Sequence, residues 1–403
     1  MEENDVLRLY ETSQRLVRGV SRSFHRRLFR EVNWDNRLIC IKGAKGTGKT
    51  TLLLQRIHDA FGANDAKALY VSLDNIWFTV HDVADLADWH WKHGGTHLFF
   101  DEVHHLKSWQ TVIKNIYDSY PDLNIVYSGS SMLRLESGSG DLSRRRVAYE
   151  LPVMSFREYL EFEGVADVEP VGLRELLSRH VELAGGICEK TKILEHYARY
   201  LKHGCYPFCR EGTKEFGLRL SEVVRQILEI DYPAIDEVSQ STIAKAKKML
   251  VILAESVPQT PKMAQLYREL ETDRNQGLKI LNALSRAGLL QLLSSQKASL
   301  KGMSRPDKIF LDNVNLMHAL SARVDVGCAR ETFFLNQLRS AGHSVAYPAQ
   351  GDFLVDGESL FEIGGSGKGF GQIRNIPGSF VAADGLETGV GNKIPLWLFG
   401  FLY

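Results

Sequence analysis

The stretch "CIKGAKGTGKTTLLLQ", residues 40–55, restricts the possible folds of this chain more than any other part of its sequence. A short apolar run, "RLICI", leads into its glycines, and leucines at helical spacing follow them. Gly43, Gly48, Lys49 and Thr50 fit the pattern G-x-x-x-x-G-K-[ST], which surrounds phosphates where it joins a strand to a helix. Because the flanking segments supply that strand and that helix, the pattern predicts an α/β fold with a nucleotide site.

The chemistry of such a loop assigns roles to its residues. Backbone N–H groups of the loop and of the helix N-terminus would surround the phosphates. Lys49 would reach the β- and γ-phosphates, and the hydroxyl of Thr50 would ligate Mg²⁺. We therefore predict a site for ATP and Mg²⁺ built from Gly43, Ala44, Lys45, Gly46, Thr47, Gly48, Lys49, Thr50 and Thr51.

A second motif, "HLFFDEVHH" at residues 97–105, places two carboxylates at the end of an apolar strand. Adjacent carboxylates at a strand end are costly unless a cation lies there. We predict that Asp101 holds the magnesium ion, through water, and that Glu102 orients or deprotonates the attacking water. A strand that ends in solvated acids is the competing interpretation, and the presence of the first loop disfavours it.

Candidate groups for the γ-phosphate follow the next predicted strand. "VYSGSS" offers the hydroxyls of Ser128 and Ser130, and "SRRRVAYEL" offers Arg144, Arg145 and Arg146. A cationic side chain from the same chain or from a neighbouring subunit stabilises the charge that develops in the transition state. We take Ser128 and Arg146 as the candidates, and a solvated basic turn is the competing interpretation of the arginines.

Short apolar runs recur between residues 37 and 130, separated by helical stretches such as "WQTVIKNIYDSY". Buried strands that alternate with helices indicate a parallel sheet covered on both faces. Ligands of such sheets bind at the carboxyl ends of the strands, where the motifs above lie. Residues 151–235 have a mostly helical pattern, and residues 241–312 have the outline of a winged helix-turn-helix, three helices and a hairpin.

The chain resembles prokaryotic AAA+-like P-loop ATPases, related to the archaeal ATPase and STAND-type branch, in which a C-terminal domain of unknown function follows the ATPase core. The resemblance rests on "WDNRLICIKGAKGTGKTTLLLQ", "HLFFDEVHHLKSWQ", "NIVYSGSSMLRL" and "ELPVMSFREYLEF", and continues in "YLKHGCYPF", "DFLVDGESLFEIGG" and "IPLWLFGFLY". It implies this division: an N-terminal helical segment (1–33), a P-loop AAA+-like ATPase core (34–165), a helical region (166–240), a winged helix-turn-helix (241–325) and a small α/β domain similar to restriction endonucleases (326–403).

A second glycine-rich run, "EIGGSGKGFG", does not fit the phosphate-loop pattern, because Glu362 stands in place of the first glycine and no hydroxyl residue follows Lys368. Under the resemblance to restriction endonucleases, Glu331, Asp352 and Glu362 would hold a divalent metal for phosphodiester cleavage. The lysine expected two residues after Glu362 is replaced by Gly364, which leaves Lys368 as its substitute. We therefore expect a retained scaffold without nuclease activity.

Composition restricts the partners of the chain. Its 403 residues include 49 basic and 49 acidic ones, and this balance disfavours binding to nucleic acid through an overall positive field. The basic run at residues 22–30, "RSFHRRLFR", is interpreted as a solvated helix face. Five scattered cysteines indicate free thiols and a cytoplasmic protein. Neither a signal peptide nor an apolar run long enough to span a membrane is found.

Two functions from different classes follow. The first is Mg-dependent binding and hydrolysis of ATP coupled to a conformational change, with an undefined physiological role. The second is an ATP-dependent switch that binds double-stranded DNA through the winged helix, where "QKASLKGMSRPDK" is basic. A protein partner or self-association is compatible with both, because winged helices also mediate protein contacts. A helicase is disfavoured, because residues 151–403 contain no second strand–helix series of the first kind.

Overall fold

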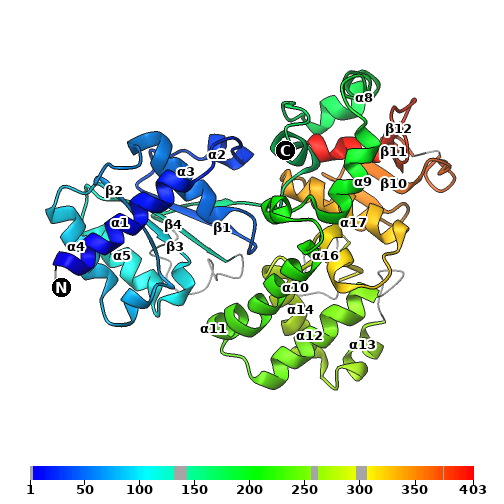
Figure 1. The fold of residues 1–403 in the computed structure, drawn as a ribbon. Coiled ribbons are helices and arrows are strands. Elements are labelled where there is room, and N and C mark those ends of the chain that lie inside the picture. Colours follow the sequence, from blue (N-terminus) through cyan, green and yellow to red (C-terminus); the bar gives the residue numbers. More distant parts are fainter. Residues whose placement is uncertain (1–2, 131–141, 143, 256–261, 296–305, 375) are drawn as a thin grey trace. The chain divides into compact units, whose positions relative to one another are not determined.

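The computed structural model describes residues 3–130, 142, 144–255, 262–295, 306–374 and 376–403. The chain divides into two compact units (Figure 1). The first unit consists of Met1–Pro152 and Ile230–Glu237, and the second consists of Val153–Glu229 and Val238–Tyr403.

The first unit contains a five-stranded sheet of order β2-β3-β4-β1-β5 in which all paired strands are parallel. Its strands are β1 (Leu38–Gly43), β2 (Ala68–Ser72), β3 (His97–Asp101), β4 (Asn124–Ser130) and β5 (Val147–Glu150). Strand β4 lies between β1 and β3, so its carboxyl end separates the ends that carry the two motifs. The predicted α/β class with a parallel sheet is confirmed.

Helices cover both faces of this sheet, as predicted. They are α1 (Glu3–Gly19), α2 (Arg27–Glu31), α3 (Lys49–Phe61), α4 (Val83–Lys92) and α5 (Trp109–Ser119), with short 3₁₀ turns η1 (Ile76–Thr79) and η2 (Val103–His105). The unit also contains α11 (Tyr232–Asp236), which contacts η2. Side chains alternate along β1: Leu38 and Cys40 pack in one cluster with residues of α4 and α5, while Ile39 and Ile41 pack in the other with residues of α3. Both clusters also contain residues of α1, so the N-terminal helix is part of this unit.

The second unit begins with helices. They are α7 (Phe156–Phe162), α8 (Leu173–Cys188), α9 (Ile193–His203) and α10 (Phe216–Gln226), with the 3₁₀ turn η3 (Pro207–Glu211) and the π-helical turn η4 (Ile227–Asp231), which leads into the first unit. After the return to the second unit come α12 (Gln240–Glu255), α13 (Met263–Glu269) and α14 (Arg274–Arg286). Two antiparallel strands follow, β6 (Leu290–Leu293) and β7 (Lys308–Leu311). Three helices and two paired strands thus stand where the sequence predicts them, but Lys297, Lys301 and Arg305 of the basic run lie outside the described residues.

A second five-stranded sheet lies near the C-terminus, in the order β12-β11-β10-β9-β8. The helices α16 (Val314–Leu320) and α17 (Val326–Ser340) precede β8 (Val345–Ala346), β9 (Phe353–Val355), β10 (Ser359–Gly365), β11 (Ser379–Asp384) and β12 (Lys393–Pro395), and the 3₁₀ turn η5 (Leu396–Phe401) follows. The three strands β8, β9 and β10 pair antiparallel, whereas β11 and β12 continue the sheet in parallel. Buried rings of Phe334 on α17, Phe361 on β10 and Phe399 on η5 pack against one another, which fixes the helix on the sheet.

The segment that follows β5 is fixed to the end of the chain. The hydroxyl of Ser155 donates to the backbone carbonyl of Tyr403 at 2.7 Å, and Arg157 Nε donates to the same oxygen at 2.9 Å. In return the Tyr403 hydroxyl donates to the Val153 carbonyl at 2.9 Å. These buried hydrogen bonds place "ELPVMSFREYLEF", which the sequence assigned to the ATPase core, largely in the second unit.

The five cysteines are free thiols, as predicted, and all but Cys188 are buried. No helix in the described part of the chain has both the length and the apolar composition that crossing a bilayer requires.

Candidate nucleotide site

The glycine-rich loop joins β1, which ends at Gly43, to α3, which begins at Lys49. Gly48 has φ of 97°, in the left-handed region that side chains rarely adopt. A Cβ atom on Gly43 would lie 2.5 Å from the carbonyl oxygen of Leu151, so this position tolerates no side chain. The strand–loop–helix context that the pattern requires is therefore present.

The side chain of Arg26 binds the backbone of the glycine-rich loop. Its guanidinium donates to the carbonyl of Thr47 at 2.6 Å and to the carbonyl of Pro152 at 2.8 Å, and only 5% of its surface is exposed. The interpretation of residues 22–30 as a solvated helix face is wrong for Arg26, because its charge is buried against backbone oxygens. Lys49 is buried too, and its ammonium donates to the carbonyls of Gly43 and Ala44 at 3.0 and 3.1 Å.

The Asp101 carboxylate, at the end of β3, contacts side chains from β2, β4 and the start of α3. Its Oδ2 accepts hydrogen bonds from the Thr50 hydroxyl at 2.6 Å and from the Tyr70 hydroxyl at 2.9 Å, and its Oδ1 accepts one from Ser128. Burial, together with the nearby Asp101 carboxylate, raises the pKa of Tyr70, so Tyr70 remains a donor. Hydroxyl and carboxylate oxygens are donors that suit Mg²⁺, so Thr50 and Asp101 fit that ion. The structure therefore brings the predicted Thr50, Asp101 and Ser128 together; the side chain of Ser130 lies outside the described residues.

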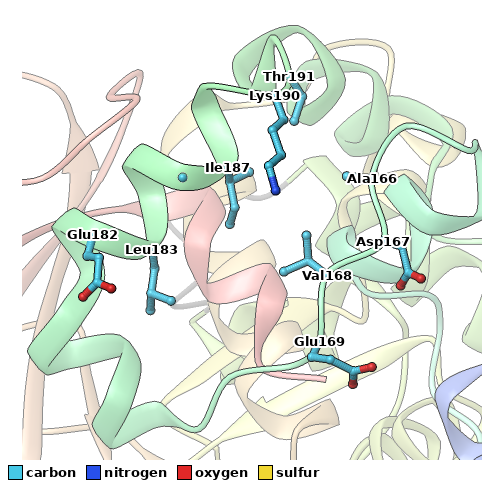
Figure 2. A pocket seen from close by; sticks show the side chains of 10 residues that line it. Ala166, Asp167, Val168, Glu169, Glu182, Leu183, Ile187, Lys190 and Thr191 are labelled. Atoms are coloured by element: carbon cyan, nitrogen blue, oxygen red, sulfur yellow. The ribbon is translucent and has the colours of Figure 1, made fainter.

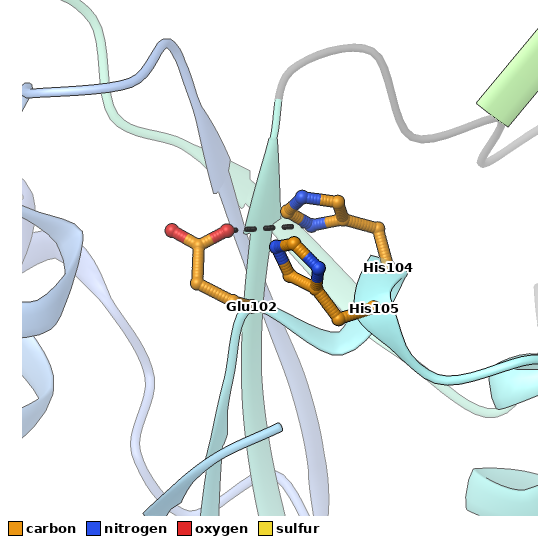
Figure 3. Close-up of side chains that lie close together, drawn as sticks. All are labelled: Glu102, His104 and His105. Atoms are coloured by element: carbon orange, nitrogen blue, oxygen red, sulfur yellow. Dashed lines mark ion pairs between the residues drawn. The ribbon is translucent and has the colours of Figure 1, made fainter. Parts of the chain in front are cut away.

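Glu102 stands at the sharp turn from β3 into η2, with φ of 52°. A positive φ is uncommon for a residue other than glycine, and such strain often marks functional positions. The Glu102 carboxylate lies 3.3 Å from Nδ1 of the buried His104, with His105 beside both (Figure 3). Burial, reinforced by the neighbouring His104, lowers the pKa of His105, which favours its neutral form.

Asp231 reaches this group from the short segment Ile230–Glu237 that belongs to the first unit. Its Oδ1 lies 3.7 Å from His104 Nε2 and 3.7 Å from Nζ of Lys45, a residue of the glycine-rich loop. Burial alone would raise the pKa of Asp231, but His104 and Lys45 hold it below its ordinary value. A carboxylate distant in sequence thus contacts both motifs of the nucleotide site.

The predicted arginines lie elsewhere in the first unit. Arg146 immediately precedes β5, whose Val147 pairs with Ile39 near the amino end of β1, whereas the glycine-rich loop follows the carboxyl end of β1. The guanidinium of Arg146 donates to the Tyr127 hydroxyl at 3.3 Å, and Arg145 binds Asp118. The structure does not bring Arg146 to Asp101 and Glu102 of its own chain, so a contact with the γ-phosphate stays a prediction for a neighbouring copy.

Four residues of this site escaped sequence reasoning: Arg26, Tyr70, His104 and Asp231. Only His104 had a signal, because "HH" follows the acidic pair after a single valine in "DEVHH". Arg26 was hidden in a run of positive charges, and Asp231 lies in a helical stretch without any motif. Their roles depend on tertiary contacts that no spacing rule reveals.

In the second unit, the residues predicted from the nuclease resemblance lie close to lysines. Lys308 Nζ is 2.8 Å from Oε2 of Glu331 and 3.9 Å from Oδ1 of Asp352. Lys368 Nζ is 2.6 Å from Oε2 of Glu362, a side chain only 2% exposed. Burial raises the pKa of Glu331, although Lys308 opposes the change. The carboxylates are therefore compensated by ammonium groups.

Gly364 explains how Lys368 reaches its partner. A Cβ atom on Gly364 would lie 2.6 Å from side-chain atoms of Lys368. The lysine side chain thus occupies the space that a residue at this position would need, and its ammonium reaches Glu362 from the following turn.

A cavity of about 410 Å³ also lies in the second unit (Figure 2). Val168, Leu183 and Ile187 supply its apolar wall, and Glu169, Glu182 and Lys190 supply charged groups. None of the residues singled out by the sequence lines it.

Comparison with known proteins adds a family to this geometry. Residues 35–160 match a family described as an AAA domain, and residues 194–325 match a domain of unknown function (DUF8612). Together with the loop and the acidic strand end, the first match supports an AAA-type P-loop ATPase domain in the first unit, and with it nucleotide binding and hydrolysis in general.

Two uncharacterized proteins of Methanocaldococcus jannaschii are similar over most of the chain. One is 27% identical over 349 residues, 80% of this chain and 73% of that protein; the other is 22% identical over 348 residues, 81% and 70%. Neither carries an assigned function in its name.

Solved structures with partial similarity include one titled "Structural Basis for Katanin Self-Assembly", at 15% identity and a TM-score of 0.25, covering 45% of this chain and 65% of that chain. PCH-2 of C. elegans has 16% identity and a TM-score of 0.24, covering 70% and 68%. DnaA of Aquifex aeolicus bound to AMPPCP has 16% identity and a TM-score of 0.25, covering 71% and 89%.

Proposed function

We propose that this chain binds Mg-ATP in its first unit, hydrolyses it, and couples turnover to a conformational change. The observation that carries the proposal is the hydrogen bond of 2.6 Å between Thr50 and Asp101. It joins the last residue of the phosphate-loop pattern to the acid at the end of β3, which is the pair of groups that ATP hydrolysis needs side by side.

The residues of the loop, Gly43 to Thr51, would surround the phosphates with their backbone N–H groups. Lys49 would exchange its present carbonyl partners, Gly43 and Ala44, for phosphate oxygens, which are stronger acceptors for an ammonium group. A magnesium ion held by Thr50 and Asp101 would offset the charge of the β- and γ-phosphates. Ser128 would keep Asp101 oriented or contact the γ-phosphate.

Glu102 would orient or deprotonate the attacking water. Its carboxylate contacts His104, whereas that of Asp101 binds Thr50, Tyr70 and Ser128, so the two adjacent carboxylates have different partners. Arg146 would act on the γ-phosphate only when delivered by a second copy of the chain.

Asp231 offers a route by which turnover reaches the rest of the chain. It lies 3.7 Å from Lys45, and phosphate groups in the loop would compete with it for that ammonium. The segment Ile230–Glu237 that carries Asp231 connects α10 to α12. A change in the partner of Lys45 would therefore act on the helices of the second unit.

Turnover of purified protein tests the proposal. Lys49→Ala should abolish ATP binding or hydrolysis, and Glu102→Gln should bind ATP without turning it over. Glu102→Gln hydrolysing ATP at the native rate would contradict the role given to Glu102, and native binding together with native hydrolysis of ATP in Lys49→Ala would contradict the site itself.

A second candidate, ATP-dependent binding of double-stranded DNA, is favoured by the surface of α14. This helix exposes Arg274, Lys279 and Arg286, and the two strands β6 and β7 follow it as in a winged helix. We assign residues 241–325 to this domain and residues 326–403 to an inactive relative of restriction endonucleases. DNA binding that weakens steeply with salt would support the candidate, and no binding at low salt would exclude it.

A further inference from the structure

Glu102, His104 and His105 form a compact group of donors beside the nucleotide site (Figure 3). One donor atom from each lies within 4.8 Å of the other two, and among the residues that the structure describes this is the group with the closeness a metal ion requires. All three come from the short turn after β3, so their backbone positions are fixed by the sheet.

The state of His104 is a second, independent observation. Its side chain is 1% exposed, and both ring nitrogens are buried without a hydrogen-bond partner. Buried polar atoms in native structures almost always have a hydrogen-bond partner or another ligand. The imidazole ring of His104, which faces Glu102, therefore lacks a partner that a bound ion would supply.

We propose that Glu102, His104 and His105 bind a transition-metal ion, best matched by Zn²⁺, at a site distinct from the magnesium site at Thr50 and Asp101. Two imidazoles and one carboxylate are a ligand set that Zn²⁺ accepts, with a fourth position open to water. Mg²⁺ prefers oxygen donors and near-ideal octahedral geometry, so it does not compete well for the two histidines.

The distances are compatible with this ion. A tetrahedral Zn²⁺ with bonds of roughly 2.0–2.2 Å places its donors roughly 3.3–3.6 Å apart. The nearest donor atoms of Glu102 and His104 are already 3.3 Å apart, and a ring nitrogen of the exposed His105 lies within 4.8 Å of the donors of both.

Asp231 lies beside the other ring nitrogen of His104. It faces Nε2 of His104, whereas Glu102 faces Nδ1 of the same ring. Histidine ligands of metals commonly donate their second ring N–H to a carboxylate, which fixes the tautomer and makes the ligand nitrogen more basic. Nδ1 of His104 is therefore the coordinating atom, and Asp231 is its positioning residue.

Metal at this site would inhibit turnover, a consequence that rests on the proposed function. It would occupy the Glu102 carboxylate, the group assigned to the attacking water. Zinc would then inhibit hydrolysis while leaving Thr50 and Asp101 in place to bind Mg-ATP.

Direct binding tests the site without any ATP. The full chain, freed of metal by a chelator, is titrated with Zn²⁺ in competition with a chromophoric chelator, alongside His105→Ala and the matched control His318→Ala, an exposed histidine of α16. We expect one Zn²⁺ per chain, at least about tenfold weaker binding in His105→Ala, and native affinity in His318→Ala. Because His105 is exposed, its replacement should leave the thermal unfolding of the chain unchanged, which excludes misfolding as the cause.

Equal zinc affinity of His105→Ala and the native chain, or no binding by the native chain, would overturn the proposal. A second measurement compares the ATPase rate of each protein with and without Zn²⁺ at constant Mg-ATP. We expect Zn²⁺ to inhibit the native chain and to inhibit His105→Ala less. Equal inhibition of both proteins would contradict the proposal that zinc inhibits turnover from this site. A chain that binds zinc and hydrolyses no ATP would refute the proposed function and leave the metal site standing.

Discussion

The hydroxyl of Thr50 donates to the Asp101 carboxylate across 2.6 Å, so one hydrogen bond joins two motifs that lie on separate strands. The contact exists because β4 alone separates β1 from β3, and Ser128 on β4 binds the other oxygen of the same carboxylate. Three hydroxyls and the backbone N–H of Glu102 donate to this buried acid, and the hydroxyl donors can be exchanged for a cation.

Replacing Thr50 tests this relationship. Thr50→Val keeps the shape of the side chain but removes the hydroxyl that would ligate Mg²⁺. We expect turnover to fall by roughly 100-fold or more, because magnesium coordination is lost in the transition state. Thr50→Ser retains the hydroxyl and should keep most of the activity. Equal rates of the valine and serine variants, measured across a magnesium titration, would contradict the assignment.

Arg26 should stabilise the first unit through the glycine-rich loop. Arg26→Met removes two hydrogen bonds from a buried cation, to Thr47 and Pro152, each worth about 1.5–3 kcal/mol when one partner is charged. We expect a clearly lower free energy of unfolding and weaker ATP binding, because the loop loses its external support. Arg22→Met is the matched control, since Arg22 is more than half exposed. Denaturant unfolding of both variants distinguishes them, and equal effects would contradict the role of Arg26.

The sequence was sufficient for the groups whose roles depend on local spacing. The loop and the acidic strand end follow from short patterns, and alternating apolar runs and helices predict the parallel sheet. Arg26 and Asp231 could not be found in this way, because their partners are backbone oxygens and side chains brought near by the fold. The segment after β5 shows the same limit: its apolar pattern is clear, but only the buried hydrogen bonds to Tyr403 decide which unit it joins.

Asp325 should make the stability of the second unit depend on pH. It caps α17 by accepting a hydrogen bond of 2.8 Å from the Cys328 backbone N–H, and this bond lowers its pKa. A lowered pKa in the folded state means that the contribution is complete above the unfolded pKa of about 3.9 and is lost as the pH falls through the folded pKa. Asp325→Ala should cost about 1 kcal/mol at pH 7 and progressively less below pH 4. Thermal unfolding at a series of pH values checks this, and Asp325→Asn, an uncharged cap, should remove most of the pH dependence.

Lys368 should stabilise the second unit by pairing with the buried carboxylate of Glu362. Lys368→Met leaves the carboxylate of Glu362, only 2% exposed, without its cation at 2.6 Å. Breaking fully buried pairs costs roughly 3–5 kcal/mol, and we expect less here because 34% of the Lys368 side chain is exposed. The double variant Lys368→Met with Glu362→Gln removes both charges and should recover most of the lost stability, since no uncompensated charge remains. Urea unfolding of the two variants decides the point: a double variant as unstable as Lys368→Met would show that the lysine acts through packing over Gly364 and not through its charge.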